Sequence, residues 1–117
     1  MTESHRVARI ERELYQLVSE FLQYQMPEVL PAFVSVTATE VSPDLKHGRV
    51  YFRLVGDKET CAETEAALSE YRKDFQNHVA KNLKTKFCPV LKFLFGRVDQ
   101  LDPVDEMLMN LKKGRKS

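Results

Sequence analysis

The sequence predicts a two-layer α+β domain, in which helices cover one face of three strands. Two observations predict this class. Apolar residues recur at steps of three and four in two long segments, which is typical of core-facing helices. Two shorter runs alternate apolar and polar residues, which is typical of half-buried strands, and a third short run, over residues 90–95, is mostly apolar. The predicted order is α-β-β-α-α-β, followed by a short C-terminal helix and a basic tail.

A long amphipathic helix is predicted at the N-terminus. We expect it to end before Pro27 and Pro31, because proline cannot continue a helical hydrogen-bond ladder. Its apolar stripe consists of Val7, Ile10, Leu14, Leu17, Val18, Phe21 and Leu22.

Two strands are predicted next, over residues 32–41 and 49–54, and about seven turn-forming residues join them. This spacing predicts an antiparallel pair. In the second strand we expect Val50, Phe52 and Leu54 to face the core. In the first, the expected apolar face holds Val34, Val36 and Ala38, and the expected hydroxyl face holds Ser35, Thr37 and Thr39.

A helical region is predicted from Gly56-Asp57 to about Lys86. We expect a break near Tyr71 to Phe75, because roughly 30 residues is long for a helix in so small a domain. One side of a helical wheel carries Leu68, Tyr71, Phe75, Val79 and Leu83. If the helix is continuous, the opposite side carries a basic ridge of Lys73, Asn77, Lys81 and Lys84.

The C-terminal part is predicted to begin with a third strand over residues 90–95, which Gly96 ends. A short helix from Asp102-Pro103 follows. We expect a domain over residues 1–111 and a disordered basic tail over residues 112–117. No apolar run reaches the roughly 20 residues of a membrane span and no secretory signal is visible, so we expect a cytoplasmic protein.

Charge is unevenly distributed, although the formal net charge is only +1. Residues 72–97 hold seven basic residues and one acidic residue, a net charge of +6. Residues 57–70 hold one basic and five acidic residues, a net charge of −4. Such asymmetry can steer an anionic partner to one face of the molecule.

Signatures of catalysis are absent from the sequence. It contains no GxGxxG, GxxxxGK[ST], GxSxG or HExxH motif. Cys61 and Cys88 form no CxxC pair, and the three histidines stand far apart. We therefore expect no enzymatic activity, no cofactor and no metal site.

One ordered set of segments resembles a known family. These segments are Arg6-Val7 with Ile10, Glu13 and Leu14, then Val36-Thr37-Ala38-Thr39-Glu40-Val41-Ser42-Pro43-Asp44-Leu45, then Val50-Tyr51-Phe52, and then Pro89-Val90-Leu91-Lys92-Phe93. In this order they resemble ribosome-binding factor A, over about residues 4 to 111. The segment from Val36 to Leu45 is the most specific piece.

The resemblance implies a KH-like fold of the second type and a role in ribosome assembly. A member of this family associates with immature small ribosomal subunits and helps 16S rRNA to mature, notably at low temperature. The family acts near the decoding region, where it precludes premature translation, and a GTPase typically assists its release. We expect a monomer that binds the 30S subunit and 16S rRNA and assists rRNA processing and folding without catalysis.

The sequence departs from the family pattern in two places. The family usually has an Ala-x-Gly kink between its central helices, where this chain has Tyr71-Arg72-Lys73, and no GxxG clamp occurs anywhere. Gly96 replaces an aspartate after the third strand. Because glycine lets the backbone approach nucleotides closely, we expect recognition of folded rRNA by shape and phosphates rather than by sequence.

The predicted RNA-binding residues lie mainly on the basic helix, with two arginines of the first helix extending the patch. An ordinary solvated lysine face, and pairing of Arg9 with Glu13, are the plainer interpretations. Two other functions stay open: a protein–protein adaptor that uses the exposed sheet face or the edge of the third strand, and a KH module for single-stranded RNA. The predicted residues are Arg6, Arg9, Arg72, Lys73, Asn77, Lys81, Lys84 and Lys86.

Overall fold

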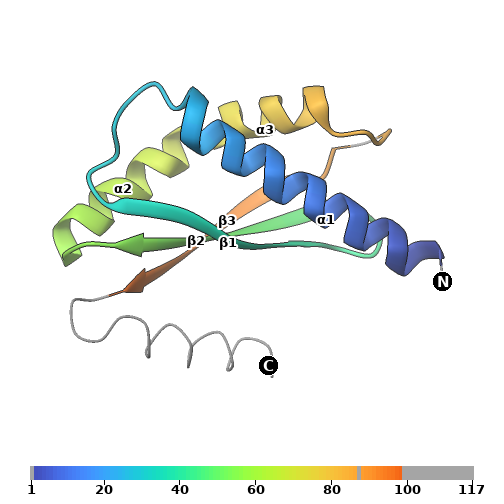
Figure 1. Ribbon diagram of the computed structural model, residues 1–117, viewed down its shortest axis with the longest axis horizontal. Helices are drawn as coiled ribbons and strands as arrows, with labels where there is room; N and C mark the ends of the chain where they lie inside the picture. The colour runs from blue at the N-terminus through green and yellow to red at the C-terminus, as the bar shows by residue number, and fades with distance from the viewer. Residues whose placement is uncertain (1, 87, 99–117) are drawn as a thin grey trace.

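The computed structural model describes residues 2–86 and 88–98, which form a sheet covered by helices on one face (Figure 1). The elements are α1 (Thr2–Glu20), the π-helical turn η1 (Phe21–Gln25), β1 (Phe33–Val41), β2 (His47–Val55), α2 (Lys58–Glu70), α3 (Arg72–Asn82) and β3 (Val90–Val98). This order confirms the predicted α+β class and its α-β-β-α-α-β arrangement. The predicted C-terminal helix, the tail and the boundary at residue 111 lie outside the described residues, and the KH-like assignment stays a prediction.

The sheet has the strand order β1-β2-β3, so β2 is central in the part of the chain that the structure describes. β1 and β2 are antiparallel, which confirms the predicted pair. β3 runs parallel to β2, from Val90 beside His47 to Val98 beside Val55. A parallel neighbour requires a long crossover, and α2 and α3 provide it.

A β-bulge in β1 changes which of its side chains face the helices. The register shifts between Val36 and Ala38, which leaves Thr37 as the extra residue. Beyond the shift, Ala38 lies opposite an outward-facing residue of β2. Thr39 instead faces the helices, and its hydroxyl donates to the backbone oxygen of Glu11 at 2.6 Å. The predicted faces are therefore wrong for Ala38 and Thr39, because simple alternation cannot show an inserted residue.

The central strand β2 and its parallel neighbour β3 differ in how well the sequence predicted them. Val50, Phe52 and Leu54 of β2 are all buried, as expected. The predicted end of the third strand at Gly96 is wrong, because β3 continues to Val98. A Cβ at Gly96 would meet only the backbone oxygen of Phe52, at 3.8 Å, so this glycine marks no close approach. Pairing with β2 carries the strand through it.

The middle helical region breaks at Tyr71, inside the predicted interval. Tyr71 has φ −91° and ψ 8° and separates α2 from α3. α3 ends at Asn82, before the predicted end near Lys86. The reason is Leu83, which is buried and adopts an extended conformation (φ −73°, ψ 131°) as the chain turns back towards the sheet.

The first helix packs on the sheet with its predicted stripe. It continues through η1 to Gln25 and ends before Pro27, as expected. Glu11 holds it to the far end of β1, because its Oε2 accepts a hydrogen bond from the backbone N–H of Val41 at 2.9 Å. The fully buried residues of the stripe are Ile10, Leu14 and Val18, with Phe21 nearly so.

Phenylalanines from four elements meet in the core. The ring centroid of Phe75 in α3 lies 4.3 Å from that of Phe21 in η1 and 6.2 Å from that of Phe52 in β2. The ring centroid of Phe93 in β3 lies 5.2 Å from that of Phe75 and 4.9 Å from that of Phe52. Such aromatic pairs add about 0.5–1.5 kcal/mol each beyond the burial of their area. They fix α3 over the central strand.

One buried hydroxyl joins α2 to the start of β1. Thr64 has 0% exposure. Its Oγ1 accepts a hydrogen bond from the backbone N–H of Ala32 at 2.9 Å and donates to the backbone oxygen of Thr60 at 2.7 Å. Without this hydroxyl the N–H of Ala32 would lose its partner in the core.

Replacing Thr64 by valine keeps the volume but removes the hydroxyl. We expect Thr64→Val to lower the free energy of unfolding by about 1–3 kcal/mol, because a buried donor loses its acceptor. Urea unfolding measures this as a lower midpoint with an unchanged slope. Thr37→Val is the matched control, since the Thr37 hydroxyl is exposed. Equal midpoints for the two variants would contradict this role of Thr64.

Candidate functional site

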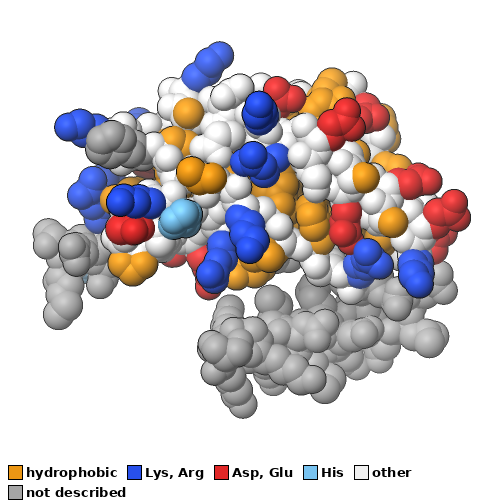
Figure 2. Space-filling model, turned by 180° about the vertical axis from the view of Figure 1, so that it is seen from behind, with side chains coloured by type: hydrophobic (Ala, Val, Ile, Leu, Met, Phe, Trp, Pro, Cys, Tyr) orange, Lys and Arg blue, Asp and Glu red, His pale blue; other side chains and the backbone are white. Residues whose placement is uncertain are grey.

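The acidic and the basic segments lie in different halves of the molecule. α2 carries the acidic segment, and α3 with the chain that follows carries the basic one. Figure 2 shows acidic side chains gathered over the half that contains α2 and most Lys and Arg side chains over the other half. One arginine of the basic segment is paired with α2, because Arg97 Nε donates to Glu65 Oε2 at 2.8 Å.

The exposed side of α3 carries three of the predicted residues. Lys73, Asn77 and Lys81 are all exposed and follow one another at one-turn spacing. Phe75 and Val79 lie buried on the opposite side of the helix. The apolar contacts of α3 therefore dictate that these polar groups face outward.

The last two predicted lysines do not continue that face. Because α3 ends at Asn82, Lys84 and Lys86 lie in the loop that leads to β3, and both are exposed. The Lys84 backbone N–H donates to Oε1 of Glu13 in α1 at 3.3 Å, so the loop is tied to α1. The predicted straight ridge through Lys84 is thus corrected to a helix face followed by a loop.

Arg72 anchors β3. It is half-buried, and its Nη1 donates to the backbone oxygen of Leu91 at 3.3 Å. One turn later, Gln76 Nε2 donates to the backbone oxygen of Pro89 at 2.8 Å, and its Oε1 accepts from the Leu91 N–H at 2.9 Å. This side of α3 therefore holds the start of β3, and contact of Arg72 with an outside anion stays a prediction.

Arg6 and Arg9 are exposed on α1. The neighbouring carboxylates of Glu11 and Glu13 accept hydrogen bonds from backbone N–H groups of β1 and of the loop after α3. These bonds hold α1 to the rest of the domain. We refer to the exposed cations of this region together as the basic half: Arg6, Arg9, Lys73, Lys81, Lys84 and Lys86.

A pocket with basic groups opens at the end of the sheet near the start of α1. Its volume is about 660 Å³, and it lies between the β1–β2 turn and the loop after α3. Arg6 lines it together with Lys46 and His47, which were not predicted as site residues. The signal that could have indicated them is a pair of adjacent basic residues one position after the turn-forming segment Ser42-Pro43-Asp44.

Hydrogen bonds hold this turn in one shape. The Ser42 hydroxyl donates to Asp44 Oδ1 at 2.6 Å, and the Lys46 backbone N–H donates to the same oxygen at 3.0 Å. The Ser42 hydroxyl accepts from the His47 backbone N–H at 3.0 Å. The Ser42 bond, and then the Lys46 bond, lower the pKa of the Asp44 carboxyl from its ordinary 3.8, because both favour the charged form.

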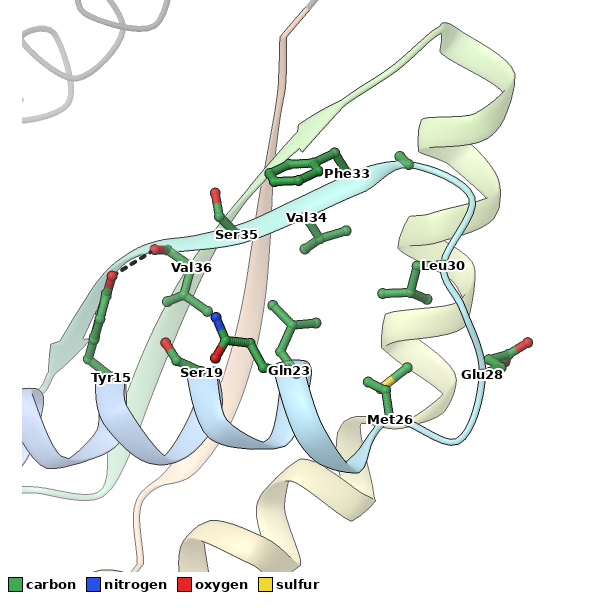
Figure 3. A pocket seen from close by; sticks show the side chains of 12 residues that line it. Tyr15, Ser19, Gln23, Met26, Glu28, Leu30, Phe33, Val34, Ser35 and Val36 are labelled. Atoms are coloured by element: carbon green, nitrogen blue, oxygen red, sulfur yellow. Dashed lines mark hydrogen bonds between the residues drawn. The ribbon is translucent and has the colours of Figure 1, made fainter.

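A different groove lies between the end of α1 and the edge of β1 (Figure 3). Its volume is about 370 Å³. Met26, Leu30 and Val34 point into it, and the Tyr15 hydroxyl closes one end by donating to the backbone oxygen of Val36 at 3.2 Å. The lining contains one charged residue, Glu28, so this groove is chemically unlike the basic half.

Metal ligands, thiols and apolar helices were the remaining features in the described residues that could indicate a function. Within residues 2–86 and 88–98, no group of three or more His, Cys, Asp or Glu side chains gathers as metal ligands. Cys61 and Cys88 are thiols and do not form a disulfide. None of the helices in these ranges is long and apolar enough to cross a membrane. The expected absence of enzymatic activity, cofactor and metal stays a prediction.

Comparison with known proteins gives a consistent result. The family model of ribosome-binding factor A matches residues 6–108. The ribosome-binding factor A of Bdellovibrio bacteriovorus is 31% identical over 118 residues, covering 100% of this chain and 88% of the relative.

Solved structures and models of ribosome-binding factor A also resemble this chain. A candidate ribosome-binding factor A from Thermotoga maritima, solved by NMR, is 30% identical with a TM-score of 0.65, over 78% of this chain and 87% of that one. A homology model of Thermus thermophilus ribosome-binding factor A, fitted into the cryo-EM map of its 30S complex, is 25% identical with a TM-score of 0.60, over 74% and 91%.

Removing the Ser42 hydroxyl tests the hydrogen bonding of the turn. We expect Ser42→Ala to raise the pKa of Asp44 towards 3.8, because the charged carboxylate loses its strongest donor. In the wild type the stabilisation is present above pH 3.8 and is lost as the pH falls through the lowered pKa. NMR titration of the carboxyl carbons measures both pKa values. Asp57, whose pKa the Thr60 backbone N–H lowers, should not respond and is the internal control.

Proposed function

The chain belongs to the ribosome-binding factor A family, and from this premise we propose that it binds the small ribosomal subunit through its basic half. The proposed ligand is 16S rRNA in immature subunits. Binding assists the folding and processing of that RNA without catalysis. The protein acts in the cytoplasm as a monomer, notably at low temperature, and a GTPase assists its release.

The separation of charge carries this proposal. A cation that neutralises a phosphate releases condensed counterions, and this term supplies much of the affinity for nucleic acid. Lys73 and Lys81 stand on a helix whose position the core fixes, and the loop with Lys84 is tied to α1. The acidic α2 lies in the other half, so the field of the molecule favours approach of RNA from one side. The fitted 30S complex of the Thermus relative supports the small subunit as the partner.

The expected mode is recognition of folded RNA by shape and phosphates. The break at Tyr71 contains no glycine, so the backbone there cannot approach nucleotides as a GxxG clamp does. The strand tyrosine that could stack on a base, Tyr51, donates its hydroxyl to Glu40 Oε1 at 2.7 Å. That bond is the main reason why the pKa of Tyr51 is raised, and it commits the side chain to its neighbouring strand.

A second candidate function is that of a protein–protein adaptor, and the groove of Figure 3 favours it. Phe33 beside this groove is 68% exposed, an apolar ring at the start of an edge strand. An extended peptide could pair with such an edge. This location differs from the sheet face and the β3 edge expected from the sequence.

Sedimentation with purified small subunits tests the choice between these functions. We expect binding that falls steeply with salt. Lys81→Gln should weaken it about fivefold to tenfold at 0.1 M salt and reduce the slope of log K against log salt by about one, because one phosphate contact is lost. Lys58→Gln removes the same charge from an exposed lysine of the acidic half and should change neither value.

Two results would count against the proposal. Equal binding by both variants would show that the α3 face is not the contact, although the partner could stand. Binding that ignores salt and is lost in Phe33→Ser would favour the adaptor, because an apolar interface does not depend on counterion release.

A further inference from the structure

We propose that the pocket beside the β1–β2 turn binds one unpaired nucleotide of RNA. This inference rests on the proposed function, since it names a subsite of the same RNA contact. The pocket volume of about 660 Å³ is in the range of sites that enclose small organic ligands. Three separate segments of the chain form it: the first turns of α1, the β1–β2 turn and the loop before β3.

Basic groups are placed for the phosphate and the sugar. Arg6 reaches the pocket from α1, and Lys46 and His47 reach it from the turn. α1 begins at Thr2, so the positive end of its dipole lies at the same end of the molecule. One carboxylate, Asp44, also lines the pocket, but its Oδ1 is held by two donors of the turn itself. Arg6 and Lys46 therefore outnumber the one carboxylate of the lining.

Apolar groups are placed for the face of the base. Val90 is 58% exposed at the mouth of the pocket, although it belongs to a strand whose next residue, Leu91, is buried. Leu45 and Cys88 also line the pocket. Burial raises the pKa of the Cys88 thiol, so it stays neutral and does not repel a phosphate. Unstacked bases are bound in this way, between apolar or aromatic side chains and arginine planes.

The backbone of the turn is held in a fixed arrangement. Leu45 has φ 64°, a conformation that ordinary residues rarely adopt and that persists only where the surroundings impose it. The Leu45 N–H donates to the backbone oxygen of Ser42 at 2.8 Å, and the Val90 N–H donates to the backbone oxygen of Lys46 at 2.9 Å. The turn and the start of β3 are thus joined, and little ordering remains to be done when a ligand binds.

This pocket is distinct from the place where a KH clamp would bind RNA. A clamp would lie at the α2–α3 break, next to Tyr71. The pocket lies beyond the opposite end of α3, after Asn82. The two locations make the proposal testable by position.

The test is an NMR titration of the whole chain with a short oligo-uridylate and, separately, with a blunt RNA duplex. We expect the single strand to shift the amide resonances of Lys46, His47 and Thr85, and the duplex to leave those of Lys46 and His47 unshifted, because neither residue belongs to the basic half. Val90→Glu should weaken oligo-uridylate binding by about tenfold, since it puts a carboxylate where the base stacks. Val29→Glu is the matched control, because Val29 is an exposed valine outside the pocket.

Lys46→Gln is a second variant that keeps the fold even if Val90→Glu disturbs β3, and it should also weaken binding. The proposal is overturned if oligo-uridylate shifts none of the pocket resonances, or if it shifts those around Tyr71 and Lys73 instead. Sedimentation with small subunits, run on the same samples, separates the two claims. Subunit binding without pocket shifts refutes the subsite alone, whereas pocket shifts without subunit binding refute the proposed function.

Discussion

The placement of Phe75 over the central strand is the constraint on which the rest of the structure depends. A continuous helix over residues 58–82 would be about 37 Å long, whereas strands of nine residues span about 30 Å. The break at Tyr71 changes the direction of the chain, and Phe75 of α3 then reaches Phe21, Phe52 and Phe93. Once that side of α3 is buried, Lys73 and Lys81 have no place except the outer surface. The core thereby determines that the basic side chains of α3 lie on the surface.

Most of the fold could be predicted because most elements have a recognisable pattern of neighbouring residues. The 3.6-residue stripe of α1, the alternation of β2 and the excessive length of the middle helical region are patterns of neighbouring residues. The errors come from pairing between distant segments. The bulge at Thr37 and the continuation of β3 through Gly96 both depend on the partner strand, and neither leaves a trace in the local sequence. The alternation of apolar and polar residues therefore cannot predict which side chains face the core after a β-bulge.

The candidate site could be predicted only where it coincides with a helix. The charge contrast between residues 57–70 and 72–97, and the outward face of α3, follow from sequence spacing alone. Three features required the tertiary structure: the early end of α3 at Leu83, the use of Arg72 as an anchor for β3, and the meeting of Arg6 with Lys46 and His47. These depend on which segments lie together. Lys46 and His47 were visible as basic turn residues, but nothing local connects them with α1.

The parallel pairing of β2 with β3 has a consequence for how the chain reaches this structure. His47 and Val90 are neighbours in the sheet although 43 positions separate them, whereas β1 and β2 are joined by a short turn. Closing the longer loop loses more chain entropy, so the hairpin should form early and the third strand should dock late. Gln76 holds both Pro89 and Leu91, so α3 captures the beginning of β3 for the sheet. Until that step is complete, the edge of β2 is open to other strands, and this is the interval in which a growing chain is most prone to aggregate.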